Sequence, residues 1–231
     1  MKLRLAPVLL LVVLAGCGDG SKTSDIPSGG ETSSSTTAAT TETQAEKAPA
    51  GCTSVPEPKP KPDGSLKKPS AKLDAKKTYT ASVKTNCGTF AFKLDVKQSP
   101  NATSSIAYLA DKKFYDGTVF HRIVPDFVIQ GGDPTGQGSG GPGYSTVDKP
   151  PSNATYKKGI VAMAKTGDEP AGTAGSQFYV VTGADAGLPP DYAIVGKVSS
   201  GMDVVDRIGK LGDQSEQPTF PVVIESFRVS G

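Results

Sequence analysis

Residues 120–133 read FHRIVPDFVIQGGD, an apolar run that places the only histidine of the chain beside one of its four arginines. Residues 118–124, TVFHRIV, have the composition of a strand, in which successive side chains point to opposite faces. His121 and Arg122 therefore cannot serve one site together. A single imidazole without partner residues is best explained as a packed, hydrogen-bonded histidine. An unpaired arginine would be costly in a core, so Arg122 is the stronger functional candidate.

Several classes of site are excluded by the composition of the chain. One histidine and the two cysteines beyond residue 17 do not make a zinc-ligand set, so no metal site is predicted. The G-x-S-x-G pattern of a serine nucleophile does not occur. Residues 131–144, GGDPTGQGSGGPGY, lack a G-K-[ST] ending and do not open a helix, which indicates a long surface turn rather than a phosphate cradle. A net charge of +2 without a basic stripe gives no indication of a nucleic-acid partner.

The first 16 residues have the pattern of a signal peptide. Lys2 and Arg4 precede an apolar run, residues 5–15, that is too short to span a membrane and of the right length for a signal sequence. The run ends in LAGC, residues 14–17, which resembles the bacterial lipobox. We therefore expect lipidation at Cys17 and a chain anchored by lipid to the extracytoplasmic face of the cell membrane. An ordinary secretory signal with a coincidental cysteine is the alternative.

Residues 17–76 are expected to form a disordered tether. The first part is rich in Ser, Thr, Gly and Ala and has few large apolar residues, so it cannot bury enough surface to offset its ordering entropy. From Val55 the segment becomes rich in Pro and Lys, which favours an extended, stiffer spacer. Its lysines could attract anionic lipids or wall polymers, but a solvated linker is the simpler interpretation.

Ordered structure is expected over residues 77–231. Residues 78–95 alternate polar and apolar side chains on either side of a turn signal at Asn86–Gly88, which predicts a hairpin. Ser99 and Pro100 begin a short helical pattern, and residues 202–211 form a second one. Further strands are predicted in residues 118–124, 159–165, 176–183, 192–198 and 221–230. Many short strands with two helices favour an antiparallel barrel or sandwich.

Three blocks in succession, residues 120–144, 159–180 and 192–208, resemble the cyclophilin-type peptidyl-prolyl cis-trans isomerases in order and spacing. The resemblance runs from about Tyr79 to Val229. It implies a mainly β fold, an eight-stranded antiparallel closed barrel capped by two α-helices, which agrees with the element count above. It also implies a catalytic domain that needs no cofactor, binds Pro-containing polypeptides and works as a monomer.

The resemblance also assigns site residues by position. Arg122 matches the catalytic arginine of the family, and the matching substrate-binding positions are Phe127, Val128, Gln130, Ala164, Gln177, Tyr179, Leu188 and Tyr192. This chain departs from the family in several places. Val128 replaces the usual Met, Tyr179 the usual Phe, and Lys165 a frequent Asn, while the segment between Ala164 and Gly175 is longer. Gly187 falls where cyclosporin-sensitive relatives carry tryptophan, and the chain has no tryptophan.

The expected function is isomerisation of X-Pro bonds in secreted or envelope proteins, which would assist their folding. A cyclophilin-like module that binds such peptides, or acts as a chaperone, with weak turnover is the alternative, because the segment around Lys165 is altered. A purely structural envelope lipoprotein would leave the Arg122 set unexplained. After lipidation an even pair of cysteines remains, Cys52 and Cys87, and an oxidising location favours a disulfide between them over two free thiols.

Overall fold

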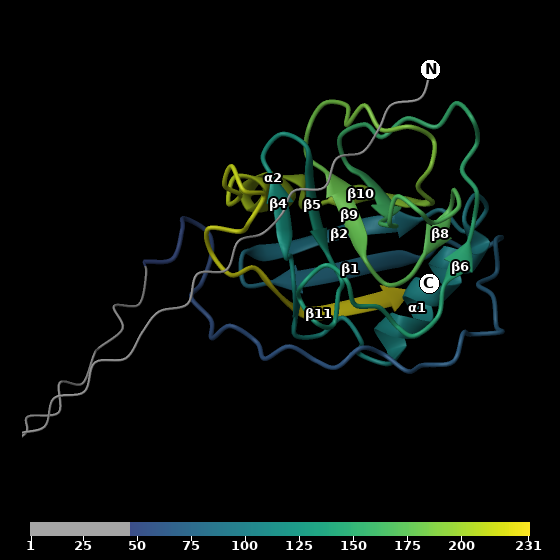
Figure 1. The fold of residues 1–231 in the computed structure, drawn as a ribbon, viewed down its shortest axis with the longest axis horizontal. Helices are drawn as coiled ribbons and strands as arrows, with labels where there is room; N and C mark the ends of the chain where they lie inside the picture. Colours follow the sequence, from purple (N-terminus) through teal and green to yellow (C-terminus); the bar gives the residue numbers. More distant parts are fainter. Residues whose placement is uncertain (1–46) are drawn as a thin grey trace, which may run out of the picture. The chain divides into compact units, whose positions relative to one another are not determined.

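The computed structural model describes residues 47–231, which form the coloured part of Figure 1. The predicted signal peptide at residues 1–16, the lipidation site Cys17 and the first part of the tether lie outside the described residues. Within residues 47–231, no helix is both long and apolar enough to span a bilayer.

The described residues form a mainly β structure with two helices. Nine strands make one antiparallel sheet in the order β3-β11-β1-β2-β10-β7-β9-β5-β4, and β6 pairs with β8 in a second, two-stranded sheet. Helix α1 packs against β11 and β6, and α2 packs against β2, β4 and β5. The element bounds are β1 Thr80–Thr85, β2 Gly88–Leu94, α1 Pro100–Asp111, β3 Thr118–Val119, β4 Arg122–Val124, β5 Val128–Gly131, β6 Thr146–Val147, β7 Ile160–Met163, β8 Thr173–Ala174, β9 Phe178–Val181, β10 Ile194–Ser200, α2 Met202–Gly209 and β11 Val223–Ser230.

The prediction of an eight-stranded closed barrel is wrong in detail, because the nine-stranded sheet curls into a half-barrel that stays open between β3 and β4. The reason lies in residues 118–124, which were predicted to be one strand. The chain breaks at Phe120 and His121, so β3 pairs with β11 while β4 pairs with β5. Phe120 is fully buried, and its N–H donates to the carbonyl of Val222. Two short strands that follow each other in sequence therefore form opposite ends of the sheet.

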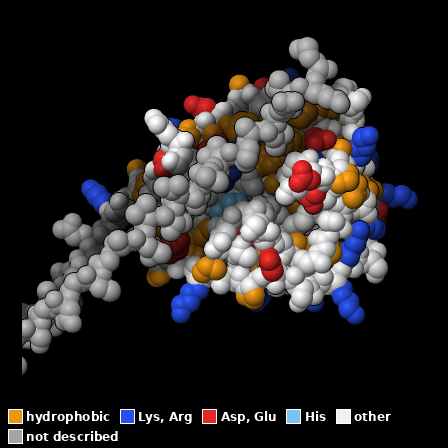
Figure 2. Space-filling model, viewed as in Figure 1, with side chains coloured by type: hydrophobic (Ala, Val, Ile, Leu, Met, Phe, Trp, Pro, Cys, Tyr) orange, Lys and Arg blue, Asp and Glu red, His pale blue; other side chains and the backbone are white. Residues whose placement is uncertain are grey.

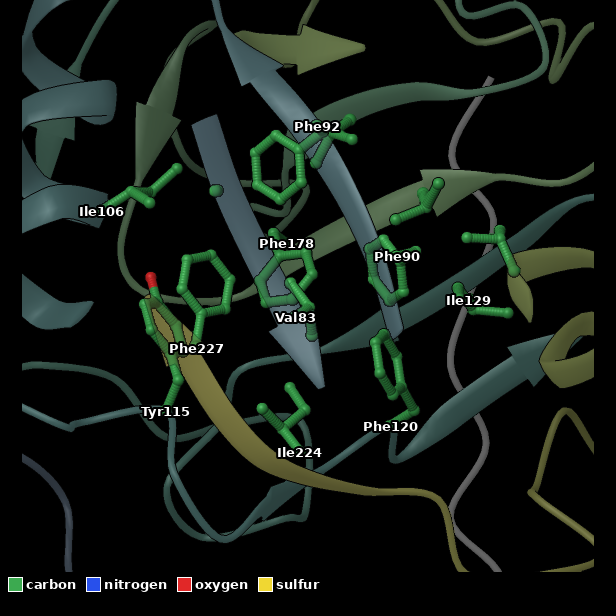
Figure 3. Close-up of a cluster of buried hydrophobic side chains, with 14 of the residues drawn as sticks. Val83, Phe90, Phe92, Ile106, Tyr115, Phe120, Ile129, Phe178, Ile224 and Phe227 are labelled. Atoms are coloured by element: carbon green, nitrogen blue, oxygen red, sulfur yellow. The ribbon is translucent and has the colours of Figure 1, made fainter. Parts of the chain in front are cut away.

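A cluster of buried hydrophobic side chains, many of them aromatic, forms the core of the domain (Figure 3). The predicted hairpin is confirmed as β1 and β2, and its alternation buries Val83, Phe90 and Phe92 completely. Phe178 and Phe227 meet them from β9 and β11, with ring centroids 5.7 Å apart. Each fully buried side chain of this size contributes about 1.5–3 kcal/mol of apolar burial, so this cluster is the main source of stability.

Residues 47–76, here called the N-terminal arm, differ from the disordered tether that the sequence predicts. The arm has no helix or strand, yet it runs along the outside of the domain, where Figure 1 draws it in dark blue. The Thr53 N–H donates to the carbonyl of Asn86, and the Leu73 N–H donates to the Ser104 hydroxyl. The predicted disulfide between Cys52 and Cys87 is present and fixes the start of the arm to the β1–β2 turn.

Candidate active site

Most of the predicted site residues line one hollow of 230 Å³, which we call the Arg122 hollow. Strand β4 supplies the arginine, β5 and β9 supply neighbouring positions, and loops supply the remainder. Its lining consists of Arg122, Phe127, Val128, Gln130, Ala164, Lys165, Tyr179, Leu188 and Tyr192. Of the nine residues predicted for catalysis and substrate binding, only Gln177 lies outside this hollow, in the wall of its neighbour.

Strand register explains why residues so far apart in sequence meet here. Arg122 of β4 lies opposite Gln130 of β5, and Gln130 lies opposite Tyr179 of β9. Directly opposed residues of an antiparallel pair share one face of the sheet, so these three side chains form a row. Val128 belongs to the same face because it precedes Gln130 by two positions. The hollow therefore lies over the β4–β5–β9 end of the sheet.

The Arg122 side chain is held on two sides. Its Nε donates to Glu216 Oε2 at 2.6 Å, and its Nη1 donates to Gln130 Oε1 at 3.4 Å. The guanidinium carbon also lies 5.8 Å from the centroid of the Phe127 ring, within the range of a cation–π contact. Among the described residues, Nη2 has no hydrogen-bond partner. The arrangement fixes the plane of the guanidinium and leaves donors for a ligand.

Glu216 is a site residue that sequence reasoning missed. It lies 94 residues after Arg122, in a turn between α2 and β11 where Asp213 Oδ1 accepts from the N–H groups of Ser215 and Gln217. The carbonyl of Glu216 accepts from the Ile123 N–H at 3.0 Å, which ties the turn to β4. Nothing in the local sequence distinguishes this acid from any other surface carboxylate.

Two glutamines connect the arginine to the Gly-rich loop. Gln130 Nε2 donates to Gln177 Oε1 at 3.0 Å, and Gln177 Nε2 donates to the carbonyls of Gly138 and Gly140 at 2.9 and 3.0 Å. Gln177 lines a second hollow of 390 Å³, here called the glycine hollow, whose wall includes residues 138–145, 164–166 and 175–177. Arg122, Gln130 and Gln177 thus form one hydrogen-bonded chain between the two hollows.

The Gly-rich loop is a turn, as predicted, and a buried carboxylate organises it. Asp133 accepts hydrogen bonds from the backbone N–H groups of Thr135, Gly138 and Gly140 at 2.7, 2.5 and 3.2 Å. Burial alone would raise the pKa of Asp133, but these hydrogen bonds outweigh it and hold the pKa below its usual value. The charged carboxylate therefore keeps the loop in one conformation.

Tyrosines form one wall of the Arg122 hollow. The rings of Tyr179 and Tyr192 meet edge to face with centroids 5.7 Å apart. Tyr156, which sequence reasoning missed, is fully buried, donates its hydroxyl to the carbonyl of Tyr192 and accepts from the Tyr192 N–H. The Tyr179 hydroxyl is buried without a hydrogen-bond partner among the described residues, and this burial raises the pKa of Tyr179.

Lys165, one of the departures from the family pattern, lies between the two hollows. Its side chain is only 3 % exposed, and its Nζ lies 2.8 Å from Asp191 Oδ2 and 5.4 Å from the centroid of the Tyr192 ring. The carbonyl of Thr166 accepts a further bond from Nζ at 3.1 Å. The buried cation is therefore neutralised by a fixed partner, as a buried charge requires.

His121 is packed as predicted but is not hydrogen-bonded. Both of its ring nitrogens are buried without a partner among the described residues. Burial lowers the pKa of His121, and Arg122 lowers it further against the opposing effect of Asp133. The imidazole is therefore neutral at physiological pH and takes no part in the chain of Arg122, Gln130 and Gln177.

Comparison with known proteins agrees with this geometry. Residues 80–229 match the family model described as cyclophilin type peptidyl-prolyl cis-trans isomerase/CLD. The chain is 39 % identical over 152 residues to peptidyl-prolyl cis-trans isomerase-like 1 of Neurospora crassa, covering 64 % of this chain and 91 % of the relative. It is 38 % identical over 172 residues to peptidyl-prolyl cis-trans isomerase A of Mycobacterium tuberculosis, covering 66 % and 93 %.

Solved structures give the same assignment. A crystal structure of a Cryptosporidium parvum cyclophilin type peptidyl-prolyl cis-trans isomerase superimposes with a TM-score of 0.62 at 30 % identity, covering 67 % of this chain and 99 % of that one. The same protein solved in the presence of the dipeptide Ala-Pro gives a TM-score of 0.61. From the family match over residues 80–229 and the shared fold, we conclude that this chain belongs to the cyclophilin-type peptidyl-prolyl cis-trans isomerase family.

Proposed function

We propose that this chain catalyses cis-trans isomerisation of X-Pro bonds in polypeptides, with Arg122 as its catalytic residue. The observation that carries the proposal is the placement of a guanidinium, held by Glu216 and Gln130, in a hollow of 230 Å³ whose apolar lining comes from Phe127, Val128 and Leu188. A proline ring can pack against these apolar side chains, and the adjacent guanidinium supplies hydrogen-bond donors.

The chemistry of the reaction explains why a cation is needed there. Rotation about an X-Pro bond is opposed by amide resonance, a barrier of about 18–20 kcal/mol. The twisted transition state loses that resonance and leaves a lone pair on the proline nitrogen. A donor directed at this nitrogen stabilises the twisted state more than either planar state, which is the condition for catalysis. Arginine is always charged and its planar fork is preorganised, so Arg122 suits this role.

The surrounding residues would divide the remaining work. A charge-assisted hydrogen bond contributes about 1.5–3 kcal/mol, or roughly one to two powers of ten in rate, so the guanidinium alone does not account for an efficient isomerase. Phe127, Leu188 and the tyrosine wall would grip the proline ring and exclude water from the bond that rotates. Gln130, fixed by Gln177, would hold the substrate backbone while the carbonyl before the proline swings.

The direct test is exchange spectroscopy of a proline-containing tetrapeptide with and without the protein. We expect the cis-trans exchange rate of the peptide to rise in proportion to protein concentration, far above the uncatalysed rate of one event in tens of seconds or longer. An exchange rate that does not respond to the protein would refute the enzymatic function.

We also propose that the enzyme acts outside the cytoplasmic membrane, anchored by lipid at Cys17, on secreted or envelope proteins. The LAGC sequence supports this location, and so does the Cys52–Cys87 disulfide, because such bonds persist in oxidising compartments. The test is detergent partitioning of the protein from membranes of a lipoprotein-processing bacterium. Cys17→Ser should move the protein into the aqueous phase, and unchanged partitioning would remove the anchor from the account.

A peptide-holding module without turnover is the second candidate, and the Lys165–Asp191 pair is the observation that favours it. Lys165 lines the Arg122 hollow and the Asp191 side chain is 40 % exposed, so this ion pair could hold the flanking residues of a peptide too firmly for rotation. Catalysis and binding must therefore be measured on the same variants. Figure 2 shows lysine and arginine side chains dispersed over the described part of the face in view with acidic side chains among them, rather than gathered in the basic patch that nucleic-acid binding would need.

A further inference from the structure

The N-terminal arm is hydrogen-bonded to the Gly-rich loop, which forms part of the wall of the glycine hollow. The arm lies before the family match, which begins at residue 80, so nothing in the family assigns it a role. Four hydrogen bonds join the arm to the loop, from Lys61 N–H to the Pro134 carbonyl (2.9 Å), from Gly64 N–H to the Gly141 carbonyl (2.9 Å), from Leu66 N–H to the Pro142 carbonyl (2.9 Å) and from Gly141 N–H to Asp63 Oδ1 (3.1 Å).

The arm and the loop approach each other as closely as two backbones can. A Cβ atom added to Gly64 would lie 2.7 Å from Pro142 Cα and 2.8 Å from the Pro142 carbonyl oxygen. A Cβ added to Gly143 on the other side would collide with the carbonyl of Gly64. Both obstacles are backbone atoms, which cannot rotate away. Glycine at both positions is therefore what allows this contact to form.

The contact is continuous with the catalytic arginine. The arm bonds to Gly141, and the carbonyls of the neighbouring Gly138 and Gly140 accept from Gln177. Gln177 accepts from Gln130, which accepts from Arg122. A displacement of the loop would therefore change the wall of the glycine hollow first and the orientation of the two glutamines second.

The arm is fixed on both sides of this contact. The Cys52–Cys87 disulfide holds it before the contact, and Lys61 Nζ donates to the carbonyl of Phe114 at 3.1 Å. Leu66, at the end of the contact, and Leu73, beyond it, pack against the hydrophobic core. The prolines between residues 56 and 62 restrict the unfolded arm, which reduces the entropy lost when it docks. Because the arm is anchored independently of the loop, it can hold the loop in place.

We propose that Asp63, Gly64 and Leu66 are positioning residues of the enzyme, which hold the Gly-rich loop so that the glycine hollow is preformed for substrate residues beside the proline. The inference rests on the isomerase function proposed above. A peptide confined to the Arg122 hollow does not reach the loop. A longer peptide that occupies both hollows contacts it and depends on the arm.

The test compares Gly64→Ala with Ser65→Ala in the full chain, on two blocked peptides, one limited to Ala-Pro and one extended by two residues on each side. Ser65 is exposed and makes no side-chain hydrogen bond, so Ser65→Ala controls for a change in the arm. Gly64→Ala should separate Asp63 and Leu66 from the loop. We expect the KM of the long peptide to rise about tenfold, as the loss of one or two hydrogen bonds implies, with kcat nearly unchanged. The short peptide should behave as it does with the parent protein.

A purely structural role for the arm would give a different pattern, because partial unfolding lowers the activity toward both peptides equally. Equal losses on both peptides, or no change on the long one in an active protein, would overturn the inference. If Gly64→Ala does not fold, Asp63→Ala removes the acceptor of the Gly141 N–H without adding an atom, and Asp63→Asn should restore it. If the parent protein shows no turnover, the proposed function fails. The role of the arm is then tested by the affinity of the same variants for the long peptide, which Gly64→Ala should weaken and Ser65→Ala should not.

Discussion

Replacement of Cys52 and Cys87 by alanine would remove the covalent link between the arm and the β1–β2 turn. The two cysteines are 35 residues apart in sequence, and the bond between them closes a loop that contains the arm from residue 52 onward. In the chain-entropy model a loop of this length costs the unfolded chain about 13 cal/mol/K, which is about 4 kcal/mol at 25 °C. For a domain of this size we therefore expect the Tm to fall by about 8–16 °C.

Two measurements separate the entropic effect of the disulfide from the effect of packing around Cys87. Cys87 is fully buried, so alanine also leaves a small cavity there. Thermal unfolding of the parent protein with and without reductant removes the bond but keeps both sulfur atoms, and it should show most of the same loss. Reductant should not change the Tm of the alanine variant. The hydrogen bonds between Thr53 and Asn86, one of them from the Asn86 side-chain amide, remain, so the loss should not exceed the entropic value by much.

A change in Tm below about 2 °C, in both the variant and the reduced parent, would refute this reasoning. It would mean that the unfolded chain is already restricted or that the arm does not dock. Alkylation of both thiols under non-reducing conditions, detected by mass spectrometry, would contradict the disulfide itself.

Two further predictions concern the Arg122 hollow and its rim. Tyr179→Phe removes a buried hydroxyl that has no partner among the described residues, so the free energy of unfolding should rise by about 1–3 kcal/mol, measured by denaturant titration. A lower stability would show that the hydroxyl is bonded. Cyclosporin should not inhibit at concentrations that stop a tryptophan-containing relative, because Gly187 supplies neither an indole N–H nor an apolar face. Inhibition curves that coincide for the two enzymes would contradict this expectation.

Local patterns in the sequence predicted the elements well where one face of a segment is buried. The hairpin of β1 and β2 followed from strict alternation, and α1 begins at Pro100 as its composition indicates. Ser99 takes the N-cap position of α1, but its side chain does not cap the helix, because it donates its hydroxyl to the carbonyl of Ile194. The Asp148 carboxylate accepts from the Ala102 N–H at 2.6 Å instead. A partner 46 residues away leaves no trace in the helix sequence.

Apart from Arg122, the site residues could be predicted only through the family resemblance. Arg122, Gln130 and Tyr179 meet because of strand register, which no single segment encodes. Glu216 could not be found, because its role depends on a turn that meets β4 only in the folded chain. The arm was expected to be disordered on composition, yet its few apolar side chains and its backbone find partners in a loop that itself lacks regular structure. The composition of a segment indicates how much apolar surface it can bury by itself. It does not indicate which hydrogen bonds and apolar contacts another segment of the folded chain provides.

The central claim is that Arg122 stabilises the twisted X-Pro bond, and the measurement that tests it most directly is kcat/KM for a proline tetrapeptide with the parent protein, Arg122→Ala and Arg122→Lys. Arg122→Ala should lower kcat/KM by about two orders of magnitude or more, which corresponds to roughly 3 kcal/mol of transition-state stabilisation, with a much smaller change in peptide affinity. Arg122→Lys should lose most of the rate as well, because a point charge on a flexible stem cannot reproduce the fork.

Thermal unfolding of the three proteins must be compared alongside, since a destabilised sheet would imitate a lost catalytic group. Weakened peptide binding in both variants, without measurable catalysis in any form, would support the peptide-holding module. The account predicts an active parent and two folded variants that bind peptide but turn it over slowly. Turnover in both variants equal to that of the parent would contradict it.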